Sequence, residues 1–348
     1  MSKYKKILIT GAGGFIGSHV AEAAREKGIG VRATDLGSTL DTDHPVRKYN
    51  VLATKKAADE VLPGDITNRE DVKKMVQGVD AIIHVASVFS YTTPWEVLYN
   101  VNVGGTKNLL EAASAEGIKK VVVIGAGGVY GMPGEKSFSE DDPPDPPNNY
   151  LKSKWFEEWL VMNSAKRLGY KYSILRPTTV YGPRQSYGGV QILEMGAFNK
   201  VVSVPSNFTA RVPFIHVKDV AGAAVHVLDA NKTSNEIFNV NDDSRYSTIE
   251  VMRIVAAAFN RPFMLLPPIP ISPVRDIMRF IAGLDKLIAK KTGKKLTNLE
   301  KDMLGFFGKD FVYTNDKLKG TGYKFLYPDP KQGILDTIKW YKEVGIFK

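Results

Sequence analysis

Residues 6–17 decide the fold and read Lys6-Ile7-Leu8-Ile9-Thr10-Gly11-Ala12-Gly13-Gly14-Phe15-Ile16-Gly17. The apolar run Lys6–Thr10 predicts a short buried strand, and the pattern Phe15–Lys27 predicts a helix. In this context Gly11 permits a tight turn, Gly14 lets a pyrophosphate approach the backbone, and Gly17 allows close packing of helix on strand. The helix N-terminus adds N–H donors and a positive dipole end. The stretch therefore predicts a dinucleotide site rather than a turn without a ligand.

An acidic residue follows at a spacing typical of such sites. Asp35 lies eighteen residues beyond Gly17, at the end of a predicted strand at Val31–Thr34. A carboxylate at this point can accept hydrogen bonds from the adenosine ribose hydroxyls. Because it would repel a 2′-phosphate, the sequence favours NAD over NADP as the cofactor.

Strands and helices alternate through the first 180 residues. Further strands are predicted near Glu60–Leu62, Ala81–Val85, Lys120–Ile124 and Tyr172–Leu175, and helices at Asn68–Gln77, Trp95–Glu116 and Asn149–Leu168. This alternation implies βαβ units, and the continuous apolar strands suit a sheet that is buried on both faces.

We therefore expect an α/β fold in two parts. Residues 1–183 should form a Rossmann-type, doubly wound parallel sheet that binds NAD, and residues 184–348 a smaller C-terminal substrate lobe. Elements from residues 212–240, at Phe214–Ala230 and Glu236–Val240, are expected to return to the sheet.

Composition excludes several kinds of site. The chain has 348 residues, a formal net charge of +10 and no cysteine, which excludes disulfides, thiolate metal sites and a cysteine nucleophile. The histidines, His19, His44, His84, His216 and His226, show no metal-ligand spacing, so no metal is expected. The apolar stretch at the N-terminus is too short for a signal peptide, and a cytoplasmic location is expected.

A tyrosine and a lysine lie four residues apart at the start of a predicted helix. Tyr150 and Lys154 therefore share one helix face. An ammonium near a phenol favours the phenolate, so Tyr150 can act as a general acid/base toward an alcohol oxygen. By spacing alone, such a pair is more often part of a solvated helix surface.

The combination of motifs resembles the extended short-chain dehydrogenase/reductase family (the NAD-dependent epimerase/dehydratase superfamily). Seven stretches stand in the family's order: the glycine loop 11–17, Asp35, Gly64-Asp65-Ile66, His84-Val85-Ala86-Ser87, Tyr150-Leu151-Lys152-Ser153-Lys154, Leu175-Arg176-Pro177 with Val180-Tyr181-Gly182-Pro183, and Phe214-Ile215-His216-Val217-Lys218-Asp219-Val220.

The resemblance implies a set of site residues. The cofactor would contact Gly11, Gly13, Gly14, Phe15, Ile16, Gly17, Asp35, Asp65, Ile66, Val85, Ala86, Ser87, Asn102, Ile124, Tyr150, Lys154, Pro177 and Val180. The substrate would contact Ser87, Thr92, Gly127 and Tyr187. Lys154 would hold the nicotinamide ribose as well as tune Tyr150, and Asp65 and Ile66 would flank the adenine.

One stretch departs from the family pattern. Alignment on Val129-Tyr130-Gly131 places Gly125 and Ala126 where the family has two hydroxyl residues, the second of which bonds the substrate oxygen. Loss of one such donor costs about 3–4 kcal/mol, or about 10²–10³ in rate. Gly127-Gly128 likewise replaces the Asp-Glu pair of related dehydratases, so sugar dehydration is not expected.

Three interpretations of Ala126 follow. Another hydroxyl, such as that of Ser87 or Thr92, substitutes; backbone N–H groups of the glycine-rich turn substitute; or the site is impaired, naturally or by an engineered Ser→Ala change. A single engineered change does not explain the glycine at 125 as well, and we favour an active enzyme with a modified site.

The C-terminal part bears on the substrate. Residues 271–296 hold seven bases and two acids, a net charge of +5, and Ile277, Ile281, Leu284 and Ile288 share one helical face. A basic amphipathic helix at 274–296 can contact an anionic membrane peripherally, although a solvated surface helix is the plainer interpretation. The apolar insert before it and the closing pattern resemble, more loosely, the 3β-hydroxysteroid and sterol-4α-carboxylate dehydrogenase branch.

The sequence thus predicts an NAD-dependent oxidoreductase that interconverts a secondary alcohol and a ketone on a bulky, lipophilic, steroid-like small molecule. Two alternatives stay open: a nucleotide-sugar 4-epimerase, and a dinucleotide-sensing or scaffold protein whose catalysis is impaired at Ala126. Nucleic-acid binding is not expected, because no basic stripe with interleaved aromatic residues is present. A homodimer is expected by analogy with the family.

Overall fold

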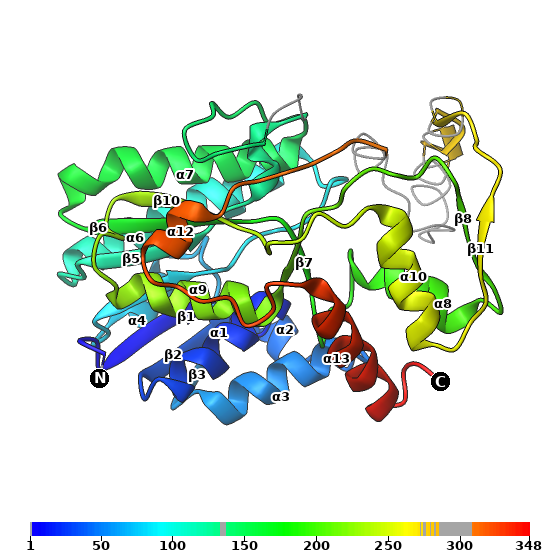
Figure 1. Cartoon of the computed structure of the whole chain (residues 1–348). Coiled ribbons are helices and arrows are strands. Elements are labelled where there is room, and N and C mark those ends of the chain that lie inside the picture. Colours follow the sequence, from blue (N-terminus) through cyan, green and yellow to red (C-terminus); the bar gives the residue numbers. More distant parts are fainter. Residues whose placement is uncertain are drawn as a thin grey trace.

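A computed structural model describes residues 2–132, 137–271, 273, 276–278, 280–281, 283–284 and 308–348. A seven-stranded sheet forms its centre, and all six strand pairings in it are parallel (Figure 1). The strands are β1 Lys6–Thr10, β2 Gly30–Asp35, β3 Glu60–Pro63, β4 Ala81–His84, β5 Lys120–Ile124, β6 Lys171–Pro177 and β10 Glu236–Val240.

The strand order places the topological switch point, called the crevice below, between β1 and β4 at the centre of the sheet. The order is β10-β6-β5-β4-β1-β2-β3, so the chain winds outward in both directions from the neighbouring strands β1 and β4. In doubly wound sheets, ligands bind at the carboxyl ends of the strands where the order reverses. The predicted Rossmann-type fold is confirmed, and the glycine loop lies at this point because it follows β1 directly.

Helices cover both faces of the sheet. One layer holds α1 Phe15–Glu26, α3 Arg47–Ala57 and α9 Val217–Asp229, and the other holds α4 Arg69–Val76, α6 Thr106–Ala115 and α7 Asn149–Leu168. A hydrophobic core lies on each face of the sheet, and alternate residues of β1 contribute to the two cores. Ile7 and Ile9 pack toward α1 and α9, and Leu8 packs toward α4, α6 and α7. Neither α3 nor the short α2 Gly37–Leu40 follows from an apolar pattern in the sequence.

The helix predicted at Trp95–Glu116 is divided into three parts. These are α5 Trp95–Leu98, the π-helical turn η1 Tyr99–Gly105, and α6. The π-helical segment carries Asn102 inward, where it is fully buried. Such turns are frequent at functional sites, because the wider winding redirects side chains.

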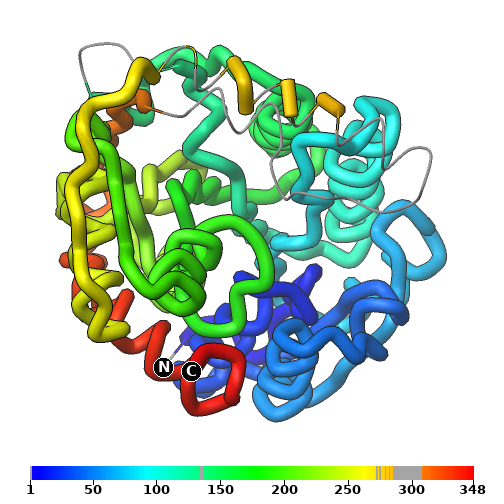
Figure 2. Tube along the Cα trace, turned by 90° about the vertical axis from the view of Figure 1, so that its right-hand side faces the viewer, coloured from blue at the N-terminus to red at the C-terminus, as the bar shows by residue number. Residues whose placement is uncertain are grey.

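The remaining elements form a smaller lobe at one end of the molecule, which faces the viewer in Figure 2. They are β7 Thr179–Tyr181, α8 Val190–Phe198, β8 Val202–Pro205, β9 Phe214–His216, α10 Thr248–Ala258, β11 Phe263–Leu266 and α13 Pro330–Glu343, whereas α12 Asp316–Gly320 packs against β10 of the main sheet. The strand β9 pairs with β7 in a separate sheet instead of joining the main one, whereas α9 and β10 do pack with the main sheet. The division at residue 183 stays a prediction.

Most of the basic segment 274–296 lies outside the described residues. Of its predicted apolar face, Ile277, Ile281 and Leu284 are described and are 59%, 41% and 44% exposed, and Ile288 is not described. Within the part of the chain that the structure describes, no helix is both long and apolar enough to cross a bilayer.

A buried carboxylate fastens the C-terminal segment to the main sheet layer. Asp219, on α9, is fully buried and accepts hydrogen bonds from the backbone N–H groups of Leu326 (2.6 Å) and Tyr327 (2.9 Å) and from the hydroxyl of Tyr323 (3.1 Å). Burial raises the pKa of Asp219, which these hydrogen bonds oppose. The Phe214–Val220 stretch that resembles a family marker therefore has a structural role here.

We expect Asp219→Asn to lower the free energy of unfolding by about 2 kcal/mol, because the amide N–H₂ then faces backbone donors. Urea unfolding measures the change. Asp141→Asn, at an exposed aspartate, is the control and should change stability by less than about 0.5 kcal/mol. Equal stability of the two variants would contradict the role given to Asp219.

Candidate active site

The glycine loop leaves the N-terminus of α1 open. Gly14 caps this helix without any side-chain hydrogen bond, and the first turn carries no acidic residue. A Cβ atom at Gly17 would lie 2.1 Å from the carbonyl oxygen of Gly11, so only glycine allows this approach of helix to strand. Backbone donors and the positive helix end are therefore available to an anion, as a pyrophosphate requires.

Asp35 lies beside this loop. Its carboxylate accepts hydrogen bonds from the N–H groups of Gly13 (2.9 Å) and Leu36 (2.8 Å). Burial raises the pKa of the Asp35 carboxyl, although these hydrogen bonds oppose the effect. The position fits an acceptor for ribose hydroxyls, and the carboxylate disfavours a phosphate at the same place.

The end of β4 forms the opposite wall of the crevice. The hydroxyl of Thr10 accepts hydrogen bonds from the N–H groups of Val85 and Ala86, both at 3.2 Å. The Oγ atom of Ser87 is buried and has no hydrogen-bond partner in the described part of the chain. The hydroxyl of Thr92, by contrast, contacts that of Ser90 at 3.2 Å.

Asn102 supports this wall from η1. Its amide oxygen accepts from the N–H of Val88 (2.8 Å), and its amide nitrogen donates to the Val88 carbonyl (3.3 Å) and to the hydroxyl of Ser153 (2.9 Å). Its hydrogen-bonding groups are thus engaged by the protein, and its predicted contact with a cofactor stays a prediction.

The other predicted cofactor residues lie on several elements around the glycine loop and the ends of the strands. Asp65 accepts hydrogen bonds from the backbone and hydroxyl of Thr67, and Ile66 is buried beside it. Phe15 and Ile16 begin α1, Ile124 ends β5, Pro177 ends β6, and Val180 lies in β7. Their contacts with a cofactor stay predictions.

Tyr150 and Lys154 lie one turn apart on α7, as predicted. Tyr150 is 8% exposed and packs edge-on against Phe89 (4.9 Å between ring centroids) and Tyr91 (5.7 Å). Tyr187 also contacts Phe89, at 5.5 Å. Aromatic rings thus form a wall around the predicted acid/base.

The electrostatic setting of Tyr150 differs from the expectation. The buried ammonium of Lys154 forms an ion pair with the carboxylate of Glu157 on the same helix. Burial raises the pKa of Tyr150, and Tyr91, Glu157 and Glu158 act in the same direction. The Tyr–Lys spacing predicted a lowered pKa, whereas the pKa of Tyr150 is raised, chiefly because the phenol is buried and to a smaller extent because of these neighbouring groups.

Glu158 explains the glycine at position 125. The guanidinium of Arg176 donates two hydrogen bonds to one oxygen of Glu158, at 2.8 and 3.0 Å. The other oxygen, Oε1, is buried, has no hydrogen-bond partner among the described residues, and lies 2.1 Å from where a Cβ atom at Gly125 would be. A side chain at this position would displace a buried, paired carboxylate.

Ala126 shares a small apolar cluster with Tyr150. The cluster also contains Leu98, Val129 and Leu151, and Tyr91 packs against it. The next residue, Gly127, accepts a hydrogen bond from the hydroxyl of Tyr313 (3.3 Å). The position of the family's second hydroxyl is therefore apolar on the side that faces the acid/base.

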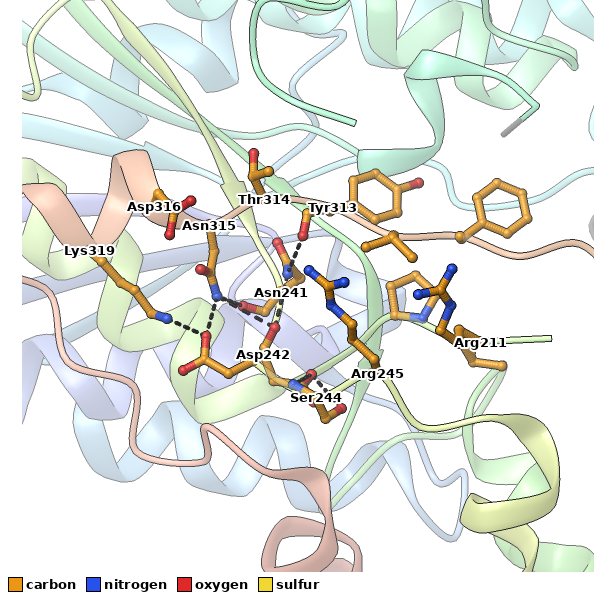
Figure 3. Close-up of a pocket in the computed structure, with 15 residues that line it drawn as sticks. Arg211, Asn241, Asp242, Ser244, Arg245, Tyr313, Thr314, Asn315, Asp316 and Lys319 are labelled. Carbon is orange, nitrogen blue, oxygen red and sulfur yellow. Dashed lines mark hydrogen bonds and ion pairs between the residues drawn. The ribbon is translucent and has the colours of Figure 1, made fainter. Parts of the chain in front are cut away.

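Tyr313 connects this site to a polar pocket of about 250 Å³ in the C-terminal part (Figure 3). Arg211 and Arg245 lie at one end and Lys319 at the other. Arg211 pairs with Asp310 and Lys319 pairs with Asp243, whereas Arg245 has no hydrogen bond or ion pair with any described residue.

One pocket residue titrates near neutrality. Asp242 is 2% exposed, and burial raises its pKa to about 7. Its Oδ2 has no hydrogen-bond partner within the described ranges. Three acids and three bases line the pocket, so it is polar without being strongly positive.

Sequence reasoning missed several of these groups. Glu157 and Glu158 follow Lys154 on a helix where acids are normally solvated, and Phe89 and Tyr91 lie in a loop without a motif. The glycine at 125, next to a strand, was the one available signal of a close approach. No cluster of three or more possible metal ligands occurs among the residues that the structure describes.

Comparison with known proteins gives consistent matches. The model of the NAD dependent epimerase/dehydratase family matches residues 7–241. The chain is 25% identical to dTDP-D-glucose 4,6-dehydratase of Homo sapiens over 358 residues, which cover 97% of this chain and 90% of that protein.

Two further proteins show the range of relatives. Sterol-4-alpha-carboxylate 3-dehydrogenase, decarboxylating, of Mus musculus is 25% identical over 252 residues, covering 70% of this chain and 66% of that protein. The structure of UDP-glucose 4-epimerase from Thermus thermophilus in complex with NAD is similar with a TM-score of 0.72 and 25% identity, covering 97% of this chain and 99% of that one. The predicted family and NAD as its cofactor are confirmed.

Because Glu158 fills the space at position 125, we expect Gly125→Ser to lower the free energy of unfolding by about 2–4 kcal/mol. Ala126→Ser adds the same hydroxyl at the adjacent residue, where a Cβ atom already exists, and should lower the free energy of unfolding by about 1 kcal/mol or less. Thermal unfolding of both variants measures the difference. A Gly125→Ser variant as stable as Ala126→Ser would contradict the packing argument.

Proposed function

The chain belongs to the NAD dependent epimerase/dehydratase family, and on that premise we propose that it interconverts a secondary alcohol and a ketone on a bulky, lipophilic, steroid-like substrate. The aromatic wall that Phe89, Tyr91 and Tyr187 form at Tyr150 carries the proposal. Phe89 is 50% exposed, so this wall is open to an apolar ligand. The three rings offer a large apolar area to a ligand, and the two tyrosines add a hydroxyl group each.

The residues of the crevice fit NAD. The open N-terminus of α1 would hold the pyrophosphate, and Asp35 would accept the adenosine ribose hydroxyls. When bound, NAD supplies the hydride chemistry. The protein's part is to orient the cofactor and substrate and to move one proton.

Tyr150 is assigned that proton. In the reductive direction its phenol donates a proton to the developing alkoxide, and in the oxidative direction its phenolate accepts the alcohol proton. Ala126 cannot polarise the substrate oxygen, so another donor is needed. The buried Oγ of Ser87, which has no partner among the described residues, is a better candidate than Thr92, whose hydroxyl already contacts Ser90.

A second function is favoured by the polar pocket. Arg245 has no ion-pair partner there among the described residues, and a guanidinium can bind a diphosphate bidentately. This supports the alternative of a nucleotide-sugar 4-epimerase, which uses the same acid/base and returns the hydride to the other face. A third alternative, a dinucleotide sensor with impaired catalysis, rests on Ala126 alone.

The decisive experiment mixes the protein with NAD and a panel of secondary alcohols that includes sterols, and follows NADH absorbance. We expect turnover with a lipophilic alcohol, loss of at least about 100-fold in kcat for Tyr150→Phe, and a gain of about 10-fold or more for Ala126→Ser.

Other outcomes select the alternatives. Conversion of a UDP-hexose with no turnover of any sterol would establish the epimerase. Absence of every activity, with none restored by Ala126→Ser, would leave the sensor or scaffold. Full activity of Tyr150→Phe would refute the assignment of the acid/base.

The raised pKa of Tyr150 predicts opposite pH profiles for the two directions. Burial, with Tyr91, Glu157 and Glu158, keeps the phenol protonated at neutral pH. Ketone reduction needs the phenol and should hold its rate up to alkaline pH. Alcohol oxidation needs the phenolate and should rise about tenfold per pH unit above neutrality. An oxidation rate that is flat from about pH 6 to 9 would contradict this prediction.

A further inference from the structure

A series of buried polar side chains in contact with one another leads from Lys154 on α7 to Thr10, just before the glycine loop. Lys154 and Glu157 are 3% and 1% exposed at their side chains and form an ion pair. The other carboxylate oxygen of Glu157 lies 3.4 Å from Nε2 of His84, at the end of β4. The hydroxyl oxygen of Thr106 lies 3.3 Å from the same Glu157 oxygen.

The series continues to the glycine loop. Nε2 of His84 lies 2.9 Å from the hydroxyl of Thr106, and Nδ1 lies 2.6 Å from the hydroxyl of Thr10. Thr10 is the last residue before the loop. The neighbouring Gly11 fits so closely against Ala86 that a Cβ atom on Gly11 would lie 2.7 Å from Ala86 Cα.

The donors and acceptors in this series of side chains fit one arrangement of protons. Thr10 Oγ accepts from two backbone N–H groups, so its proton is available to Nδ1 of His84. The Thr106 hydroxyl donates to the carbonyl of Asn102 (2.6 Å), which leaves its lone pairs to face Nε2–H. A proton on Nε2 of His84 and an acceptor at Nδ1 satisfy both ends of this arrangement, and that proton also points toward Glu157.

The neighbouring charges are separately compensated. Burial raises the pKa of Glu157, but Lys154 and His84 outweigh it and hold that pKa below its ordinary value, so the carboxylate is ionised. Glu158 is held by Arg176, which stacks over Tyr130 at 4.7 Å. Each of the two adjacent carboxylates therefore has its own cation.

We propose that Glu157 is a positioning residue for the cofactor site. Its carboxylate fixes the ammonium of Lys154 on α7 and ties it, through His84 and Thr10, to the strands β4 and β1 on either side of the crevice. The proposal rests on the function proposed above, in which Lys154 contacts the nicotinamide ribose. It assigns to Glu157 the alignment of that ammonium with the glycine loop.

A purely structural ion pair is the rival explanation. Breaking a buried pair by removing one partner destabilises a fold, whereas neutralising both partners is often tolerated. Stability alone therefore cannot separate the two explanations. The affinity for NADH can, because a structural role predicts no change in binding by the folded protein.

The test is a double-mutant cycle on NADH affinity, measured by fluorescence titration without substrate at a temperature where every variant is folded. We expect Glu157→Gln to raise the dissociation constant about tenfold in the wild-type background and less than about twofold in Lys154→Met. Thr106→Val, which keeps all charges, should raise it about threefold. It serves as the second variant if Glu157→Gln does not fold.

Lys120→Met is the matched control. Lys120 is a 3% exposed lysine that donates to Ser173, at the amino end of β5 and remote from the glycine loop, and its loss should lower stability while leaving NADH affinity within about twofold. Unchanged affinity in both Glu157→Gln and Thr106→Val, or equal weakening in both Lys154 backgrounds, would overturn the proposal. Because binding is measured without substrate, failure of every substrate in the panel would remove the proposed reaction and leave this result standing.

Discussion

The contact between Gly17 and the carbonyl of Gly11 sets the geometry on which the site depends. With no side chain between them, α1 can lie directly on the end of β1 and aim its uncapped N-terminus at the centre of the sheet. The same approach leaves room for Asp35 to reach the N–H of Gly13. A parallel sheet brings the ends of β1, β2 and β4 to one edge, so this single contact positions an anion site, a ribose acceptor and the loop after β4 together.

On the other side of the crevice, α7 carries the Tyr150–Lys154 pair and two acidic residues within about two turns. Tyr150, Lys154, Glu157 and Glu158 are all buried, and each carboxylate has a separate cation. The glycine at 125 belongs to this arrangement, since Glu158 occupies the space where a family hydroxyl side chain would begin. The departure at residues 125–126 thus has two causes of different kinds: a packing requirement at the glycine, and an apolar surface beside Tyr150 at the alanine.

The sequence predicted the parts that a local pattern encodes. The strands β1, β2, β4 and β5 and the helices α1 and α7 follow from apolar runs and the glycine motif, within a residue or two at their ends. The mostly polar α3 has no clear apolar pattern of its own and packs against α1, which is distant in the sequence, so it was not predicted. The π-helical η1 was not predicted because its amino-acid composition is that of an ordinary helix. The environment of Tyr150 likewise comes from residues that meet only in three dimensions, such as Phe89 and Tyr91. The spacing from Lys154 predicted a lowered pKa for the Tyr150 phenol, because spacing shows neither the burial of the phenol nor the pairing of Lys154 with Glu157.

This arrangement bears on whether the chain is a catalyst. Buried ion pairs stabilise a fold less than well-packed apolar side chains of similar volume, so a protein that served only as a scaffold gains little from them. Here two such pairs lie side by side beneath a buried tyrosine, and a third buried polar group, His84, joins one of them to the glycine loop. Local violations of the rules for stability are expected at functional sites. The charges retained on α7 therefore fit the proposed acid/base role of Tyr150. Because Ala126 has no hydroxyl, that proposal also needs a donor to the substrate oxygen, for which the buried hydroxyl of Ser87 is available.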